Sequence, residues 1–129
     1  MANMKNDRLE ELSELCELFR STPLSTVINN QNTILEIDEF ISHLPPSFIL
    51  KKLDRLNVNE RLSIIANYLK KEIQEKVCVG LDYCHKEKSI KLISDASLII
   101  LNIIISSVGL ALLSLAALIS IYYLDELCS

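Results

Sequence analysis

Four cysteines and two histidines are the residues of this chain whose chemistry could support a reactive or metal-binding site. They are Cys16, Cys78, Cys84 and Cys128, together with His43 and His85. Cys78, Cys84 and His85 are close enough in the sequence to supply part of a zinc site. The chain has no second pair of cysteines or histidines at the spacing that zinc sites use. We therefore predict no metal and no cofactor.

Motifs of catalytic sites are missing from the chain. It contains no nucleophile elbow, phosphate-binding loop or H-E-x-x-H motif, and its two glycines cannot build a Gly-rich loop. Glu36, Asp38 and Glu39 cluster in the sequence, but on a helix they fan outward as a solvated face. We predict no catalytic residue and no enzymatic activity. No basic cluster is interleaved with aromatic residues, and the net charge is −4, so nucleic-acid binding is not expected.

The most prominent segment of the chain is the uncharged run over residues 96–124. It holds 29 residues, mostly Leu, Ile, Val and Ala. As one α-helix it would be ~44 Å long, which exceeds the ~30 Å hydrocarbon core of a bilayer. Two membrane spans would each need ~17–20 residues, so the run is too short for a membrane hairpin. We predict a juxtamembrane junction and a single C-terminal transmembrane helix within 92–124, followed by a short acidic tail, 125–129.

Residues 1–91 are expected to form an all-α cytosolic domain, a small bundle of about four amphipathic helices. Gly and Pro are scarce, and apolar residues recur at helical spacing. The expected helices cover 7–20, 33–44, 47–56 and 60–79. Thr33-x-x-Glu36 has the form of a capping box at the start of the second helix.

Two apolar helix stripes in this domain are candidate partner-binding faces. The first consists of Leu9, Leu12, Leu15 and Phe19, and the second of Leu62, Ile65, Leu69 and Ile73. Such a stripe packs either on a partner helix or on other helices of the same domain. Both alternatives are open from the sequence, and the intramolecular core is the simpler one.

Small and polar residues recur along one face of the expected transmembrane helix. This seam consists of Asn102, Ser106, Gly109, Leu113, Ala116 and Ser120. Small residues allow membrane helices to approach closely, so the seam predicts self-association into a homo-oligomer. Tyr122 and Tyr123 stand where the downstream headgroup region is expected.

The charges beside the uncharged run predict its orientation. Lys86, Lys88 and Lys91 precede it and could face anionic lipid, whereas only acids follow it. The positive-inside rule then places the N-terminal domain in the cytosol. No base follows the run, which favours the endoplasmic reticulum or secretory membranes over mitochondria. Cys128 would lie across the membrane from the other cysteines, and we expect free thiols.

These features predict a tail-anchored, non-enzymatic adaptor that recruits or sequesters an unidentified protein partner at an intracellular membrane. A membrane-permeabilising oligomer of the viroporin or holin type is the first alternative, since the seam could line a pore. The layout of helices, anchor and a few terminal residues is also similar to that of tail-anchored apoptosis regulators and of small viral replication-membrane proteins. That resemblance implies either a regulator of apoptosis or a viral replication-membrane protein.

Overall fold

The computed structural model describes residues 4–45 and 56–129, and of residues 4–6 it describes the backbone alone. All regular elements in these ranges are helical, which confirms the all-α prediction. The predicted helix over 47–56 falls almost entirely outside the described residues. The elements are α1 (Met4–Arg20), α2 (Leu24–Val27), α3 (Gln31–Ser42), α4 (Val58–Ile73), the π-helical turn η2 (Gln74–Val79), the 3₁₀ turn η3 (Tyr83–His85), α5 (Ile90–Val108), α6 (Leu113–Tyr122) and α7 (Leu124–Leu127).

Asparagine side chains begin two of the outer helices. Asn30 accepts a hydrogen bond from the backbone N–H of Asn32 at the start of α3. At the start of α4, Asn57 and Glu60 bond each other's backbone N–H groups in a capping box. The predicted cap at Thr33 is therefore wrong. Thr33 lies within the first turns of α3 and is buried, because the helix begins two residues earlier.

The uncharged run is not one helix, and the prediction of a single C-terminal helix over 96–124 is wrong. Gly109 has a φ of 75°, in the left-handed region, and ends α5 as its C-terminal cap. Residues 110–112 are not helical, and α6 then begins at Leu113. Glycine is the residue best suited to this turn, because the left-handed region is strained for residues with a Cβ. The run is folded back on itself as a helical hairpin.

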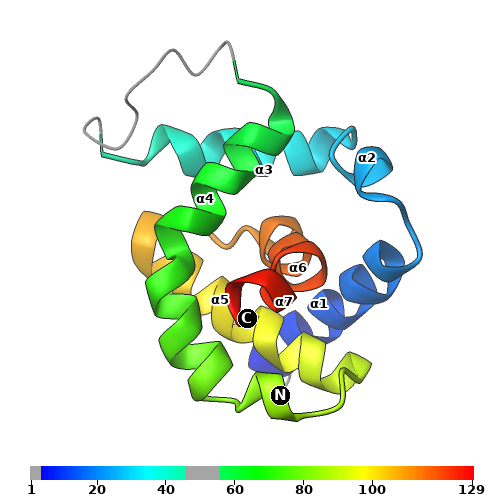
Figure 1. Ribbon diagram of the computed structural model, residues 1–129. Coiled ribbons are helices and arrows are strands. Elements are labelled where there is room, and N and C mark those ends of the chain that lie inside the picture. Colours follow the sequence, from blue (N-terminus) through cyan, green and yellow to red (C-terminus); the bar gives the residue numbers. More distant parts are fainter. Residues whose placement is uncertain (1–3, 46–55) are drawn as a thin grey trace.

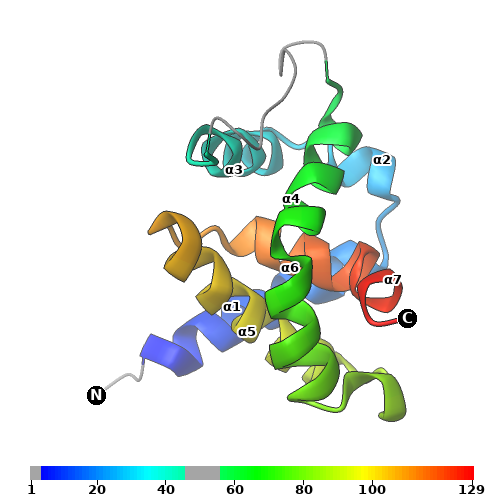
Figure 2. The same cartoon turned by 60° about the vertical axis from the view of Figure 1, so that its left-hand side comes forward.

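This hairpin, formed by α5 and α6, is the centre of the molecule. The two helices pack against each other, and both pack against α1. α3 lies on α6, and α4 lies on α3 and α5, so the amphipathic helices cover part of the apolar ones and leave one side of α5 at the surface (Figures 1 and 2). Residues of all these helices share one hydrophobic core, including Leu12, Phe40, Leu62, Ile100 and Leu115, none of which is exposed.

The helix α5 is long and apolar enough to cross a membrane by length and composition. It has 19 residues and a mean hydropathy of 1.7 over its most apolar window, of which 50% is buried inside the molecule. The 10 residues of α6 rise only ~15 Å, about half of a bilayer core. Among the described helices, the one long and apolar enough to cross a membrane thus begins at Ile90 and ends at Val108. It is an internal helix of the chain rather than its C-terminal one.

Replacing Gly109 tests the break in the run. No atom lies within 4 Å of a Cβ built at Gly109, so the cost of Gly109→Ala is that of the left-handed backbone alone. We expect the variant to lower the free energy of unfolding by ~1–2 kcal/mol in urea denaturation. A continuous helix through this position would instead gain ~1 kcal/mol from the same change. Ser106→Ala, in the exposed part of α5, is the matched control and should be nearly neutral.

Candidate functional site

The central hairpin is the candidate functional site, because its segment has the most unusual composition in the chain. Its two legs are α5 and α6, and its elbow is defined as residues 105–113. Side chains on the inner faces of both legs are buried, among them Ile100, Ile104 and Leu118, each 0% exposed. The site is therefore an apolar structure held inside a shell of amphipathic helices.

A chain of polar side chains crosses the middle of the hairpin. Ser120 Oγ donates to the carbonyl of Ala116 at 2.9 Å, and Ser97 Oγ donates to Ser120 Oγ at 2.7 Å. Cys16 Sγ lies 3.1 Å from Ser97 Oγ and is the donor of that pair, because the Ser97 proton is already used. Burial raises the pKa of the Cys16 thiol, which keeps it protonated as a donor. These bonds join α1, α5 and α6 at one level.

Tyr122 ties the end of the hairpin to the end of α1. Its hydroxyl donates to the carbonyl of Phe19 at 2.8 Å and also to that of Thr22. Tyr122 and the neighbouring Tyr123 are half-buried against the protein. The two tyrosines thus close the C-terminal end of the hairpin over α1 and α4 in this fold.

Glu36 of α3 supplies the N-terminal cap of α6. Its Oε1 accepts the backbone N–H of Leu115 at 2.9 Å, which satisfies one donor that the helix end leaves unpaired. Burial raises the pKa of the Glu36 carboxyl, and its bonds with Leu115 and Ser114 oppose part of that rise. The sequence placed Glu36 on a solvated face, and its role was missed because the partner lies 79 residues away.

The elbow is exposed and carries no charge. Its exposed residues are Ser106, Ser107, Gly109 and Ala111, whereas Ile105, Val108, Leu110 and Leu113 are half-buried and Leu112 is buried. In Figure 2 the link between α5 and α6 lies on the left-hand side of the molecule, below α3. The elbow therefore offers an uncharged surface on which small and serine residues accompany partly covered apolar ones.

The predicted seam is divided between the surface and the core. Asn102, Ser106 and Gly109 are exposed on α5 and at the elbow, whereas Ala116 and Ser120 are buried in the hairpin. Leu113 is half-buried between them. The six residues therefore do not share one face in this fold, and self-association through the seam stays a prediction.

Most residues of the two predicted partner-binding stripes lie in the core. Those buried are Leu12, Phe19, Leu62, Ile65, Leu69 and Ile73. Leu9 and Leu15 are half-buried at the α1 surface. In this fold the stripes pack against the hairpin, and a partner could reach them only if the hairpin moved away.

The three lysines before the run lie at the far end of α5 from the elbow. Lys86 and Lys91 are exposed, and Lys91 pairs with Asp95 at 3.4 Å. Lys88 is held by the protein: its ammonium lies 4.0 Å from the centroid of the Tyr83 ring and donates to the carbonyl of Lys86 at 3.0 Å. Lipid contact by these residues stays a prediction.

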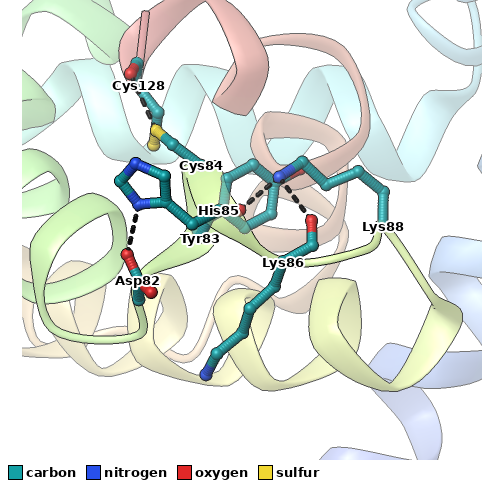
Figure 3. A network of polar contacts seen from close by, with 7 residues as sticks. All are labelled: Asp82, Tyr83, Cys84, His85, Lys86, Lys88 and Cys128. Atoms are coloured by element: carbon teal, nitrogen blue, oxygen red, sulfur yellow. Dashed lines mark hydrogen bonds and ion pairs between the residues drawn. The ribbon is translucent and has the colours of Figure 1, made fainter.

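A corner with three cysteines joins the C-terminus to the end of α4, and it corrects the prediction of free thiols. Cys78 and Cys128 form a disulfide with Cα atoms 5.3 Å apart, so in this fold both lie on the same side of any membrane. Cys84 and Cys16 are free. Cys84 Sγ donates to the carbonyl of Cys128 at 2.9 Å (Figure 3). No sequence spacing identifies a pair that is 50 residues apart.

The turn η3 is fastened at this corner by polar contacts. The Tyr83 hydroxyl donates to Asp125 Oδ1 at 3.1 Å, and burial, with the Asp125 carboxylate beside it, raises the pKa of Tyr83. His85 Nδ1 lies 2.6 Å from Asp82 Oδ1. Figure 3 shows Lys88 reaching back over the turn. Among residues 4–45 and 56–129, no three His, Cys, Asp or Glu side chains converge in a way that could hold a metal ion.

Substituting Glu36 tests its role as the cap of α6. Glu36→Gln keeps an oxygen acceptor for Leu115 and removes the buried charge, so we expect equal or higher stability at pH 7. Glu36→Ala leaves the N–H unpaired and should lower the free energy of unfolding by ~1–3 kcal/mol. Urea denaturation measures both, with the exposed Glu11→Gln as control.

The pH dependence of stability gives a second readout of the same carboxyl. Because the folded pKa of Glu36 lies above its ordinary value of 4.5, the fold binds this proton more tightly than the unfolded chain does. Protonation of Glu36 therefore stabilises the fold. This stabilisation is complete below pH 4.5 and is lost as the pH rises through the folded pKa of Glu36. Glu36→Gln should lack that loss. Identical pH profiles for the two proteins would contradict a buried carboxyl.

Comparison of the chain with protein-family models, with curated proteins and with solved structures found no match.

Proposed function

We propose that this protein is a non-enzymatic effector that places its α5–α6 hairpin in a lipid bilayer. One observation carries the proposal. The 29-residue uncharged run is stored as a hairpin inside a shell of amphipathic helices, and its elbow reaches the surface without a charged side chain. A structure of this kind can bring a membrane-active segment to a bilayer with much of its apolar surface covered by protein.

The hydrophobic effect gives little preference between the two environments of the hairpin. Lipid tails are about as apolar as leucine side chains, so the buried half of α5 and the buried residues of α6 exchange one apolar cover for another. Moving the hairpin from the protein core into the bilayer exposes the apolar faces of α1, α3 and α4 to water, and this exposure is the unfavourable term in the free energy of insertion. Amphipathic helices can bury such faces at the boundary between headgroups and acyl chains.

The ends of the hairpin favour entry with the elbow first. Charged residues stand at both ends, Lys91 and Asp95 before the run and Asp125 and Glu126 after it. The disulfide also keeps Cys128 beside Cys78. Each half of the run, as a helix, is ~22 Å long, which passes the bilayer midplane and falls short of the far side. The inserted form we propose is therefore a hairpin with both ends on one side.

Recruitment of a protein partner fits the same process as a later step. The stripes that begin at Leu9 and Leu62 pack in the core while the hairpin is inside, and they become available when it leaves. Placement of the N-terminal part in the cytosol stays a prediction. The disulfide argues against that placement, because structural disulfides persist mainly in oxidising compartments.

A covalent lock between α1 and α5 tests the proposal. Cys16 and Ser97 are both 0% exposed, and their side-chain atoms are 3.1 Å apart, so Ser97→Cys places two thiols within reach of a disulfide. The locked protein should not resist carbonate extraction from vesicles of phosphatidylcholine and phosphatidylserine, whereas wild type should. Flotation of the vesicles after the carbonate wash measures the bound fraction.

The matched control is the double variant Cys16→Ser with Ser97→Cys, which has the same new thiol and cannot form the lock. It should insert like wild type under oxidising conditions, where the Cys78–Cys128 bond is intact in all three proteins. Equal retention of locked and unlocked proteins would show that the hairpin does not leave the core. A tag after residue 129 that protease cannot reach would contradict a hairpin and indicate a single crossing.

A further inference from the structure

The corner with three cysteines places a free thiol beside a disulfide. Cys78 lies in η2 after α4, Cys84 belongs to η3, and Cys128 follows α7, so three separate elements bring these residues to one corner. Cys84 is exposed, and its Sγ already contacts the backbone of Cys128 at 2.9 Å (Figure 3). Neither the helix packing nor the proposed insertion of the hairpin needs this free thiol.

We propose that Cys78, Cys84 and Cys128 form a thiol–disulfide exchange site. Cys84 loses its proton to solvent, and the thiolate attacks Sγ of Cys128. A Cys84–Cys128 bond forms, the Cys78–Cys128 bond breaks, and Cys78 leaves as a thiolate that takes a proton from solvent. The reaction is an isomerisation in which one disulfide replaces another, so it needs no external oxidant or reductant.

The surroundings of Cys84 favour attack on Cys128. The Tyr83 bond to Asp125 fastens the turn that carries Cys84 to the segment that carries Cys128. The carbonyl that Cys84 contacts and the Sγ that it would attack belong to the same residue, so the thiol is already held against the residue that carries its target. A cavity of about 240 Å³ at this corner provides the space. It is lined by Tyr83, Cys84, Lys88, Asp125, Cys128 and Ser129.

The cavity also gives the site access to other thiols. It opens beside Cys84 and Cys128, and both the thiol and the disulfide are reached from the same side. A small-molecule thiol could therefore enter and take the place of Cys84 as the attacking group. The buried Cys16, which is held by Ser97 in the hairpin, has no such access.

Exchange changes which element holds the C-terminus. In the structure, the disulfide links the residue after α7 to η2, at the end of α4. After exchange, the link runs to η3, six residues further along the chain. This inference does not rest on the proposed membrane function, because the pairing of cysteines can be measured in the absence of lipid.

Disulfide mapping of the full-length oxidised protein tests the exchange. The protein is held at pH 8, sampled over time, quenched with acid and alkylated at its free thiols. Trypsin cannot separate Cys78 from Cys84, since no Lys or Arg stands between them, but a protease that cuts before aspartate cleaves at Asp82 and Asp125. We expect the Cys84–Cys128 peptide to appear beside the Cys78–Cys128 peptide, with alkylated Cys78 rising in step.

Two variants make the result decisive. Cys78→Ser leaves Cys84 as the neighbour of Cys128, and it should form the Cys84–Cys128 bond when oxidised by glutathione disulfide. Cys16→Ser is the matched control and should exchange like wild type. Circular dichroism checks that each variant is folded. The proposal is overturned if wild type keeps Cys84 as its alkylated thiol at every time, if Cys84 pairs with Cys78 instead, or if folded Cys78→Ser leaves Cys84 and Cys128 unpaired.

Discussion

The whole fold depends on hiding a run of 29 uncharged residues from water in a chain of 129 residues. A single helix of that length would project well beyond a domain of this size, because such a domain is only about as wide as a 20-residue helix is long. Folding the run at Gly109 halves its length and lets each leg cover the other. α1, α3 and α4 then cover part of the remaining surface, and one side of α5 stays exposed.

Polar contacts decide how the hairpin sits in its shell. Apolar packing alone would tolerate several arrangements of two helices rich in leucine and isoleucine. The bond between Ser97 and Ser120 aligns the two legs, and Tyr122 fixes the end of α6 over α1. Glu36 brings α3 to the start of α6. Each of these groups would be left unpaired by a slip of one helix along another, so together they favour a single arrangement.

Periodicity in the sequence was enough to predict the outer helices. The stripes of α1 and α4 repeat at helical spacing, and most of their residues do lie in the core. The break at Gly109 could not be predicted in the same way, because a glycine inside an apolar run is equally at home in a membrane helix. That glycine ends α5 in a left-handed conformation, and α6 then packs back on α5, which is a tertiary contact that composition does not reveal.

The functional features were missed for a related reason. Glu36 reaches Leu115 across 79 residues, and Cys78 reaches Cys128 across 50, so no local pattern connects either pair. Glu36 also matched a capping box with Thr33, and this local interpretation hid the tertiary one. Contacts between residues that are far apart in the sequence can be recognised in the folded structure but not from local sequence patterns.

The uncharged run is suited both to a protein core and to a bilayer. The residues at its two ends bear on how it could enter a bilayer, as a hairpin or as a single crossing. In the fold, its apolar residues are covered by protein, while the sequence alone matches a bilayer. A straight crossing would place Cys128 on the far side of the membrane, which the bond to Cys78 does not allow. A hairpin satisfies the disulfide, the charges at both ends and the turn at Gly109 together. Insertion as a hairpin, as proposed above, keeps the disulfide and both charged ends on one side of the bilayer.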